Sequence, residues 1–413
     1  MTEIFRFRLP NGLRVVHNYN PQLSLSVVNT LYNVGGRDES PDHTGLAHLF
    51  EHLMFGGSAN IPDFDAPLQA AGGNSNAWTS NDFTCFHNIL PAHNIETAFW
   101  LESDRMLSLA FSDKALEVQR SVVVEEFKEV CLNRPYGDMG HRLFAMAYPD
   151  HPYGIPVIGR NFHDIEKTTQ DDVRNWFYSH YAPNNAILSI VGNITPERIE
   201  ELVTKWYSDI PRREIAPRSF ADPALPESPR LVEAEGNVPQ TAITIAYSMG
   251  GYKSANYVPA DLITDILANG LSSRFYRRLL MPGNIFTDVD ASILGTEHPG
   301  LLLINAKLIK NGKDAEQEAI NSINNELNEL IHNGVEQHEL TRCVNRLESD
   351  RLFSMMSPLQ KAQSLAIAEL HEEQLEDILP RYRKVTPEII RQTASDIFNP
   401  NRAMTLIYRP IQK

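Results

Sequence analysis

Two stretches of the 413-residue chain, PQLSLSVVNTLYNVGG at residues 21–36 and PQTAITIAYSMGG at residues 239–251, follow one pattern. Each begins with Pro-Gln, continues with alternating apolar residues and ends in Gly-Gly. Such alternation predicts a strand, and the glycine pair predicts a turn after it. Helical spacing of apolar residues follows both turns. The chain therefore contains an internal repeat, which implies two halves of similar fold.

A second pair of segments supports the repeat. Residues 107–126 align with residues 330–348, and three landmarks match in the same order: Glu117 with Glu339, Arg120 with Arg342, and Glu126 with Glu348. Three ordered matches are less easily produced by chance than one.

The domain boundary is predicted from proline. Five prolines between Pro211 and Pro229 lie in a polar stretch that neither a helix nor a central strand tolerates. We therefore predict an N-terminal domain at 1–215, a Pro-rich linker at 216–232 and a homologous C-terminal domain at 233–413. Further strands are predicted at about 4–17, 84–89, 186–192 and 403–408, and helices at about 94–109, 114–132 and 313–333. Because these elements do not alternate one for one, we predict an α+β fold and not a doubly wound parallel sheet.

Composition narrows the function classes. Lys plus Arg is 37 and Asp plus Glu is 52, and the net charge of −15 has the wrong sign for binding nucleic acid. Cys85, Cys131 and Cys343 are too few and too scattered for a disulfide framework or a cysteine-based zinc site. Neither a signal peptide after Met1 nor an apolar run of about 18 residues is found. We therefore expect a cytoplasmic protein with no membrane span, or a periplasmic one if a leader was removed.

The run GLAHLFEHLMF at residues 45–55 predicts a helix that carries the pattern His-x-x-Glu-His. Residues four apart lie one above the other on a helix, so His48 and His52 can direct both imidazoles at one metal ion. Glu51 lies on nearly the same face, where its carboxylate can take a proton from water. The alternative is a chance grouping on an exposed face. The many apolar neighbours disfavour it, because polar groups on a packed helix need a reason.

A catalytic zinc site usually has three protein ligands, so a third must come from elsewhere. The helix predicted at 114–132 carries the carboxylates Glu125, Glu126 and Glu129. For any one of them a solvated acidic face is the alternative, and periodicity alone does not choose among the three.

These residues, taken with other segments, resemble the inverted zincins, the family of pitrilysin, insulysin and mitochondrial processing peptidase. Within this family the chain resembles the short bacterial-type members, whose single chain holds two homologous domains. The matching segments cover nearly the whole chain: Asn11-Gly12-Leu13, Gly72-Gly73, Asn76-Ala77-Trp78-Thr79, His151-Pro152-Tyr153-Gly154 with Gly159, and Tyr181-Ala182-Pro183-Asn184-Asn185 with Val191-Gly192. The resemblance implies that each domain is a mostly antiparallel sheet packed with helices.

The resemblance also implies a zinc-dependent endopeptidase. In the family pattern His48, His52 and Glu126 bind zinc, Glu129 is the second choice for the third ligand, and Glu51 is the general base.

Family members hold the substrate as an added strand on a sheet edge. That segment here is 74–79, which makes Asn76, Ala77 and Trp78 candidate substrate-binding residues. Core packing is the alternative for Trp78, and it is the preferred interpretation of Phe83 and Phe86.

The sequence departs from the family at two places. The glutamate that normally lies seven residues before the third ligand is Gln119 here. The Arg and Tyr that active members place in the C-terminal half align with Leu280 and Phe286. Phenylalanine cannot donate a hydrogen bond to an oxyanion. A shifted gap brings Arg278 into range, but no alignment restores the hydroxyl.

These departures suggest that two chains together form the active site. We expect this chain to supply the zinc half of an active site, while a homologous partner chain in a heterodimer supplies the Arg and Tyr; a homodimer is the other arrangement considered. The second half of the chain has no His-x-x-Glu-His counterpart, since its matching helix lies around Asp261–Leu267. The alternative function is a non-catalytic structural or binding subunit. The complete set of two histidines and two glutamates in the first half disfavours it.

Overall fold

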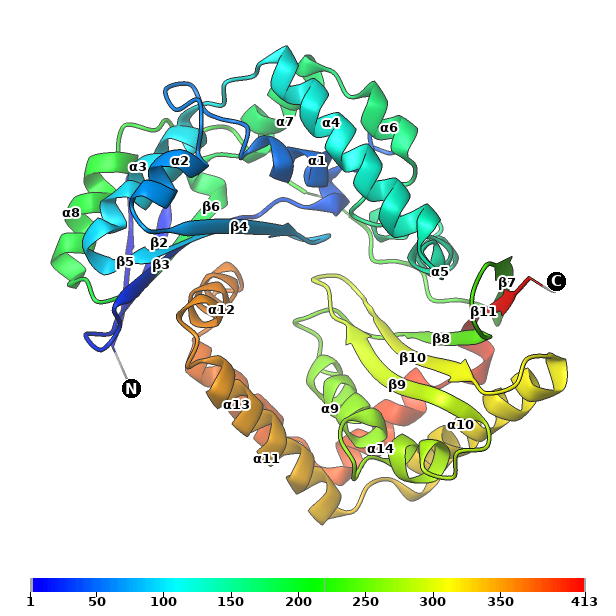
Figure 1. The fold of residues 1–413 in the computed structure, drawn as a ribbon. Helices are drawn as coiled ribbons and strands as arrows, with labels where there is room; N and C mark the ends of the chain where they lie inside the picture. The colour runs from blue at the N-terminus through cyan, green and yellow to red at the C-terminus, as the bar shows by residue number, and fades with distance from the viewer. Residues whose placement is uncertain (1–2, 219, 412–413) are drawn as a thin grey trace. The chain divides into compact units, whose positions relative to one another are not determined.

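The computed structural model describes residues 3–218 and 220–411, which fold into two compact units (Figure 1). The first unit is formed by the described residues of 1–128, 155–219 and 351–375. The second is formed by those of 129–154, 220–350 and 376–413. Each unit contains one sheet and its covering helices.

The first sheet has the strand order β1-β2-β6-β3-β5-β4. Neighbouring strands are antiparallel except for the parallel pair β2 and β6. The strands are β1 (Ile4–Arg8), β2 (Arg14–Tyr19), β3 (Leu25–Tyr32), β4 (Asn74–Thr79), β5 (Thr84–Pro91) and β6 (Ala186–Gly192).

The second sheet has the order β7-β11-β8-β10-β9, in which only β7 and β11 are parallel. Its strands are β7 (Arg230–Gly236), β8 (Ala242–Ser248), β9 (Phe286–Leu294), β10 (Leu301–Leu308) and β11 (Met404–Pro410). This order and these directions repeat those of β2-β6-β3-β5-β4. Two homologous halves, each with a mostly antiparallel sheet, are therefore confirmed.

Two predicted elements are corrected. The single strand predicted at 4–17 is the hairpin β1–β2, because a tight turn interrupts it. The Leu9 N–H donates to the Leu13 carbonyl at 3.0 Å and the Gly12 N–H to the Leu9 carbonyl at 2.9 Å. The helix predicted at 114–132 is the α-helix α4 (Asp113–Phe127), followed by a π-helical segment at Lys128–Asn133.

The helices of the first unit are α1 (Leu46–Leu53), α2 (Asp65–Ala70), α3 (Ile95–Leu107), α4, α6 (Phe162–Lys167), α7 (Gln170–His180), α8 (Pro196–Tyr207) and α12 (Pro358–Leu370). The second unit contains α5 (Met139–Ala147), α9 (Tyr257–Ala268), α10 (Lys313–Asn333), most of α11 (Gln337–Ser354), nearly all of α13 (Leu375–Arg383) and α14 (Pro387–Ile397). None of the helices in the described residues has the length and apolar character that crossing a bilayer requires.

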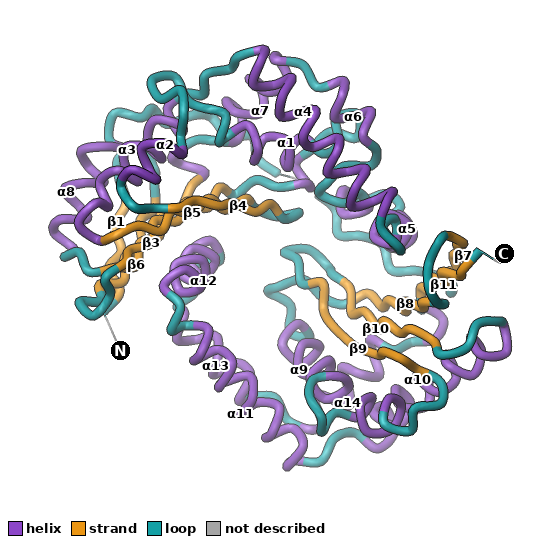
Figure 2. The backbone as a smooth tube through the Cα atoms, in the orientation of Figure 1, coloured by secondary structure: helices purple, strands orange, loops and turns teal. Residues whose placement is uncertain are grey.

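Each sheet has one face covered by a helix from the other half of the chain. In the first unit the strands lie between α3 and α8 on one side and α12 on the other (Figure 2). The buried residues of α12 are Ala362, Leu365 and Ala366, which pack on Val16, Val27, Leu31, Cys85, Ile187 and Val191. In the second unit, α5 packs Leu143, Met146 and Ala147 on Ala246, Leu301, Met404 and Leu406.

The sequence-based domains at 1–215 and 233–413 follow the repeat, and the compact units differ from them by the exchange of 129–154 and 351–375. These two segments are exchanged because each sheet has a second apolar face, which needs a covering layer. Within the linker predicted at 216–232, residues 216–218 and 220–229 form neither helix nor strand, whereas 230–232 begin strand β7.

Leu365→Ala tests whether α12 is part of the first unit's core. Leu365 is 1% exposed, so its truncation should lower the free energy of unfolding by about 2–5 kcal/mol in urea denaturation. Leu352→Ala, in the same segment but 62% exposed, is the matched control and should stay within about 0.5 kcal/mol of wild type. Equal effects of the two changes would show that α12 does not pack on the sheet.

Candidate metal centre

The helix that carries both histidines, α1, is fixed at its N-terminal end by Glu39. The Gly45 and Ala47 N–H groups donate to the Glu39 carboxylate at 2.8 and 2.7 Å, so two of the free donors of the first turn are paired. Burial raises the pKa of the Glu39 carboxyl to about 8, while these two N–H groups favour its ionised form. Gly45 has a left-handed φ of 85°, and a Cβ there would lie 2.9 Å from the Ile158 carbonyl oxygen. Glycine is therefore needed where α1 begins.

Helix α4 supplies the third candidate ligand, Glu126. Its first turn is capped by Ser112, whose hydroxyl accepts from the Ala115 N–H at 3.0 Å. The buried stripe of α4 includes Val123, and Glu126 follows it by three residues, which places it beside that stripe. Helix α4 packs on α1 (Figure 1), and the last turn of α4 carries Glu126, which lies close to both histidines.

One ligand atom from each of His48, His52 and Glu126 can be chosen so that all three lie within 4.8 Å of one another. The Nε2 atom of His52 lies 3.4 Å from Glu126 Oε2, and that of His48 lies 3.8 Å from Glu126 Oε1. Zinc–ligand bonds of about 2.0–2.2 Å in a tetrahedron separate neighbouring ligand atoms by about 3.3–3.6 Å. The spacing of this donor set thus fits a zinc ion with little rearrangement.

The protonation of the three side chains also suits a cation. Burial lowers the pKa of His48, which favours the neutral imidazole that a metal requires. The hydrogen bond with Glu126 raises the pKa of His52, and the same bond lowers the pKa of Glu126. Glu126 therefore stays ionised, and a divalent cation would compete with a proton on His52 alone.

Glu51 lies beside this group and is held by Thr79. The Thr79 hydroxyl donates to Glu51 Oε2 at 2.5 Å. Burial raises the pKa of Glu51, whereas the Thr79 hydrogen bond and nearby His52 lower it. A carboxyl group whose pKa is raised by burial takes up a proton more readily, as a general base that later returns the proton requires.

The other candidate carboxylates lie elsewhere. Glu125 pairs with Lys128 at 2.7 Å, and Glu129 pairs with Arg134 at 3.4 Å, with both glutamate side chains more than half exposed. Gln119 is in contact with the site, because its side chain hydrogen-bonds His52 and thereby contributes to the raised pKa of that histidine.

The candidate substrate strand, β4, is the last strand of its sheet and pairs with β5 alone. Its Ala77 N–H donates to the Asn76 side chain at 2.8 Å, so this backbone donor is not used in pairing with β5. Trp78 packs edge-on against Phe83 with ring centroids 5.4 Å apart, and both contact the core beneath α12. Phe86 is fully buried, and Phe83 is partly buried and packs against the core that α12 covers, which agrees with the preferred interpretation of both residues.

The two positions that the sequence analysis aligned with the family's Arg and Tyr are apolar and packed. Phe286 is 2% exposed and lies in the core of the second unit, and partly buried Leu280 packs against the same core. Arg278, which a shifted alignment would favour, pairs with Glu326 at 2.9 Å. The helix of the second unit that corresponds to α1 is α9, which carries no histidine.

Sequence reasoning missed two residues that position the site. Glu39 lies six residues before Gly45, and Thr79 is distant in the chain from Glu51. Neither is part of a local spacing pattern, because Glu39 acts at a helix start and Thr79 acts from a neighbouring strand. The one sequence feature that included Thr79 is the family-like segment Asn76-Ala77-Trp78-Thr79.

Comparisons with known proteins agree with this architecture. Residues 14–160 match the family model "Insulinase (Peptidase family M16)", and residues 167–347 match "Peptidase M16 inactive domain". The zinc protease PqqE of Helicobacter pylori is 25% identical over 97% of this chain and 92% of its own length. The beta subunit of mitochondrial-processing peptidase from Saccharomyces cerevisiae is 26% identical over 63% of this chain and 57% of its own length.

Solved structures share the fold along the whole chain. The crystal structure of a protease from Helicobacter pylori matches with a TM-score of 0.92 at 25% identity, covering 99% of this chain and 100% of that one. Pitrilysin matches with a TM-score of 0.84 at 19% identity, covering 100% of this chain and 45% of pitrilysin. Because both halves match models of a single family in chain order, this chain belongs to peptidase family M16.

Proposed function

We propose that this chain is a zinc-dependent endopeptidase in which His48, His52 and Glu126 bind the metal. The observation that carries the proposal is the spacing of the three donor groups, in which the 3.4 and 3.8 Å distances to Glu126 lie close to the edges of a zinc tetrahedron. The name "zinc protease" carried by relatives of nearly equal length supports the choice of metal.

Bound zinc lowers the pKa of water and polarises a peptide carbonyl. Glu51 takes the proton from the attacking water and passes it to the leaving amine, as its position beside the histidines permits. Thr79 holds the Glu51 carboxylate in one orientation through the 2.5 Å hydrogen bond. The ligand side chains are 15%, 25% and 39% exposed for His48, His52 and Glu126, so a substrate can reach the centre.

The free edge of β4 holds the substrate by backbone pairing, with Asn76, Ala77 and Trp78 as contacts. Main-chain pairing supplies affinity without strong sequence preference. It also requires an extended chain, and the substrates are therefore peptides or unfolded segments.

A homologous partner chain completes the active site. Phe286 is buried and has no hydroxyl, and Leu280 has no charge, so this chain does not offer the Arg and Tyr of active family members at those positions. A partner in a heterodimer supplies them.

The second candidate function is a non-catalytic subunit. It is favoured by the description of residues 167–347 as an inactive domain. That description applies to the half without His-x-x-Glu-His, and the first half retains every candidate metal and proton-transfer residue, so the peptidase is preferred.

The variants Glu126→Gln and Glu129→Gln test which of the two glutamates is the third zinc ligand. Zinc affinity, measured by competition with a chromophoric chelator, should fall by at least about 10²-fold for Glu126→Gln, because a ligand matters more than the residues that orient it. Glu129→Gln should leave zinc affinity within about threefold of wild type, since Glu129 pairs with Arg134. The reverse ranking would assign the third ligand to Glu129.

Glu51→Gln separates metal binding from hydrolysis. The variant should keep its zinc and lose about 10²–10⁴-fold in the rate of peptide hydrolysis, because the proton acceptor is removed. Glu125→Gln, an exposed neighbour paired with Lys128, is the matched control and should hydrolyse normally. Undiminished hydrolysis by Glu51→Gln would remove Glu51 from the mechanism.

The partner requirement is tested by assaying the purified, zinc-loaded chain alone and after co-purification with a homologous chain. The chain alone should cleave unstructured peptides weakly, and the complex should cleave them fully. Replacing Glu51 in the complex should abolish the gain, which excludes activity from the partner itself. Full activity of the chain alone would disprove the requirement for a partner while leaving the peptidase proposal intact.

A further inference from the structure

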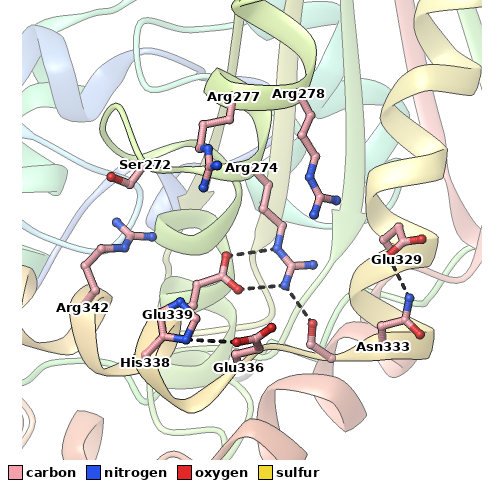
Figure 3. Close-up of a pocket in the computed structure, with 11 residues that line it drawn as sticks. Ser272, Arg274, Arg277, Arg278, Glu329, Asn333, Glu336, His338, Glu339 and Arg342 are labelled. Atoms are coloured by element: carbon pink, nitrogen blue, oxygen red, sulfur yellow. Dashed lines mark hydrogen bonds and ion pairs between the residues drawn. The ribbon is translucent and has the colours of Figure 1, made fainter.

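The second unit contains a cavity of about 600 Å³ that is rich in arginine (Figure 3). It is lined from one side by the segment around Ser272–Arg278 and from the other by the end of α10 and the start of α11. Four arginines line it: Arg274, Arg277, Arg278 and Arg342. Such a concentration is notable in a chain whose net charge is −15.

Two of the four arginines are held by carboxylates but keep free donors. Arg274 donates through Nε and Nη2 to Glu339, at 3.1 and 2.9 Å, and through Nη2 to the Gly334 carbonyl at 2.8 Å. Arg278 donates through Nη1 to Glu326 at 2.9 Å. The Nη1 group of Arg274 and the Nη2 group of Arg278 have no recorded partner among the described residues. Both side chains are thus held in place by carboxylates, and each keeps one N–H-bearing group available for a ligand.

The other two arginines form no ion pair within the described part of the chain. Arg277 makes neither an ion pair nor a hydrogen bond there, and its side chain points into the group of arginines in Figure 3. The Nη2 group of Arg342 is buried and without a hydrogen-bond partner. A buried, unpaired guanidinium N–H is costly, and a ligand oxygen would remove that cost.

The acidic residues of the cavity are largely engaged with other groups. Glu339 is bound by Arg274, Glu336 pairs with His338 at 3.1 Å, and Glu329 accepts from the Asn333 amide at 2.8 Å. Four arginines face three glutamates in the lining, so positive charge is in excess by one; Arg277 makes no ion pair in the described residues, and Arg342 lies near Asp265 without a salt bridge to it.

We propose that this cavity binds a phosphate group, either free or carried by a small molecule. The planar fork of a guanidinium matches the geometry of phosphate oxygens, and several forks around one space favour an oxyanion over a neutral ligand. A volume of about 600 Å³ exceeds what one phosphate fills and lies in the range of small-molecule sites, so it leaves room for a compound that carries the phosphate. The site is independent of the metal residues and of the proposed peptidase activity.

The test is isothermal titration calorimetry of the full chain with two probes, inorganic phosphate and adenosine monophosphate. Adenosine monophosphate should bind saturably and at least tenfold more tightly than phosphate, which identifies a phosphomonoester as the ligand. Equal affinities would identify free phosphate. Absence of saturable binding by both probes would overturn the proposal.

Matched variants locate the binding. Arg277→Gln and Arg342→Gln should each weaken binding at least tenfold, whereas Arg402→Gln, an exposed arginine of the same unit outside the cavity, should not change it. Affinities unchanged in both cavity variants would place the anion elsewhere, including at a bound metal, and would overturn the proposal. The melting temperature without ligand shows whether each variant is folded. If Arg342→Gln is unfolded, Arg342→Lys keeps the charge without the fork and should bind with intermediate affinity.

Discussion

The second apolar face of each sheet has to be covered, and in both units the covering helix comes from the opposite half of the chain. Helix α12 buries Ala362, Leu365 and Ala366 on the first sheet. Helix α5 buries Leu143, Met146 and Ala147 on the second. The chain therefore leaves the first unit at Glu129, three residues after Glu126. Helix α4 ends there and gives way to π-helical turns, a local distortion often found at functional sites. Glu126, the third candidate ligand, thus lies just before the point at which the chain passes from the first unit to the helix that covers the second sheet.

The candidate metal centre is supported on the sheet side by a buried charged group. Arg105 lies 5.5, 4.4 and 4.5 Å from the ring centroids of Phe55, Phe64 and Phe86. Its partner Glu102 also accepts from Thr30 and from Asn88. Because Phe55 directly follows the end of α1, these contacts fix that end, while Glu39 fixes the other. Both charges of this pair are buried and paired with each other, although the Arg105 Nη1 group has no hydrogen-bond partner, and losing either residue would leave an uncompensated buried charge.

Much of the candidate site was predictable because its spacing is local. His48, Glu51 and His52 need only the periodicity of one helix, and the two strands before Gly-Gly need only alternation. Glu126 needed the family pattern, since periodicity left Glu125 and Glu129 equally open. The exchange of α5 and α12 was not predictable, because an apolar stripe shows that a helix is buried and does not show which sheet it covers. Glu39 and Thr79 act through contacts made after folding, and for this reason no spacing pattern indicated their roles.

Gln119 changes the charge of the centre in a way that bears on both affinity and proton transfer. With neutral histidines, Glu51 and Glu126 contribute two negative charges, which a divalent cation neutralises. A glutamate at position 119 would leave one extra negative charge beside His52, strengthening cation binding but raising the pKa of Glu51 by repulsion. Glutamine keeps the hydrogen bond to His52 without that charge. The Glu51 carboxyl, already raised in pKa by burial, is thereby kept nearer to its ionised form at neutral pH, at the expense of metal affinity.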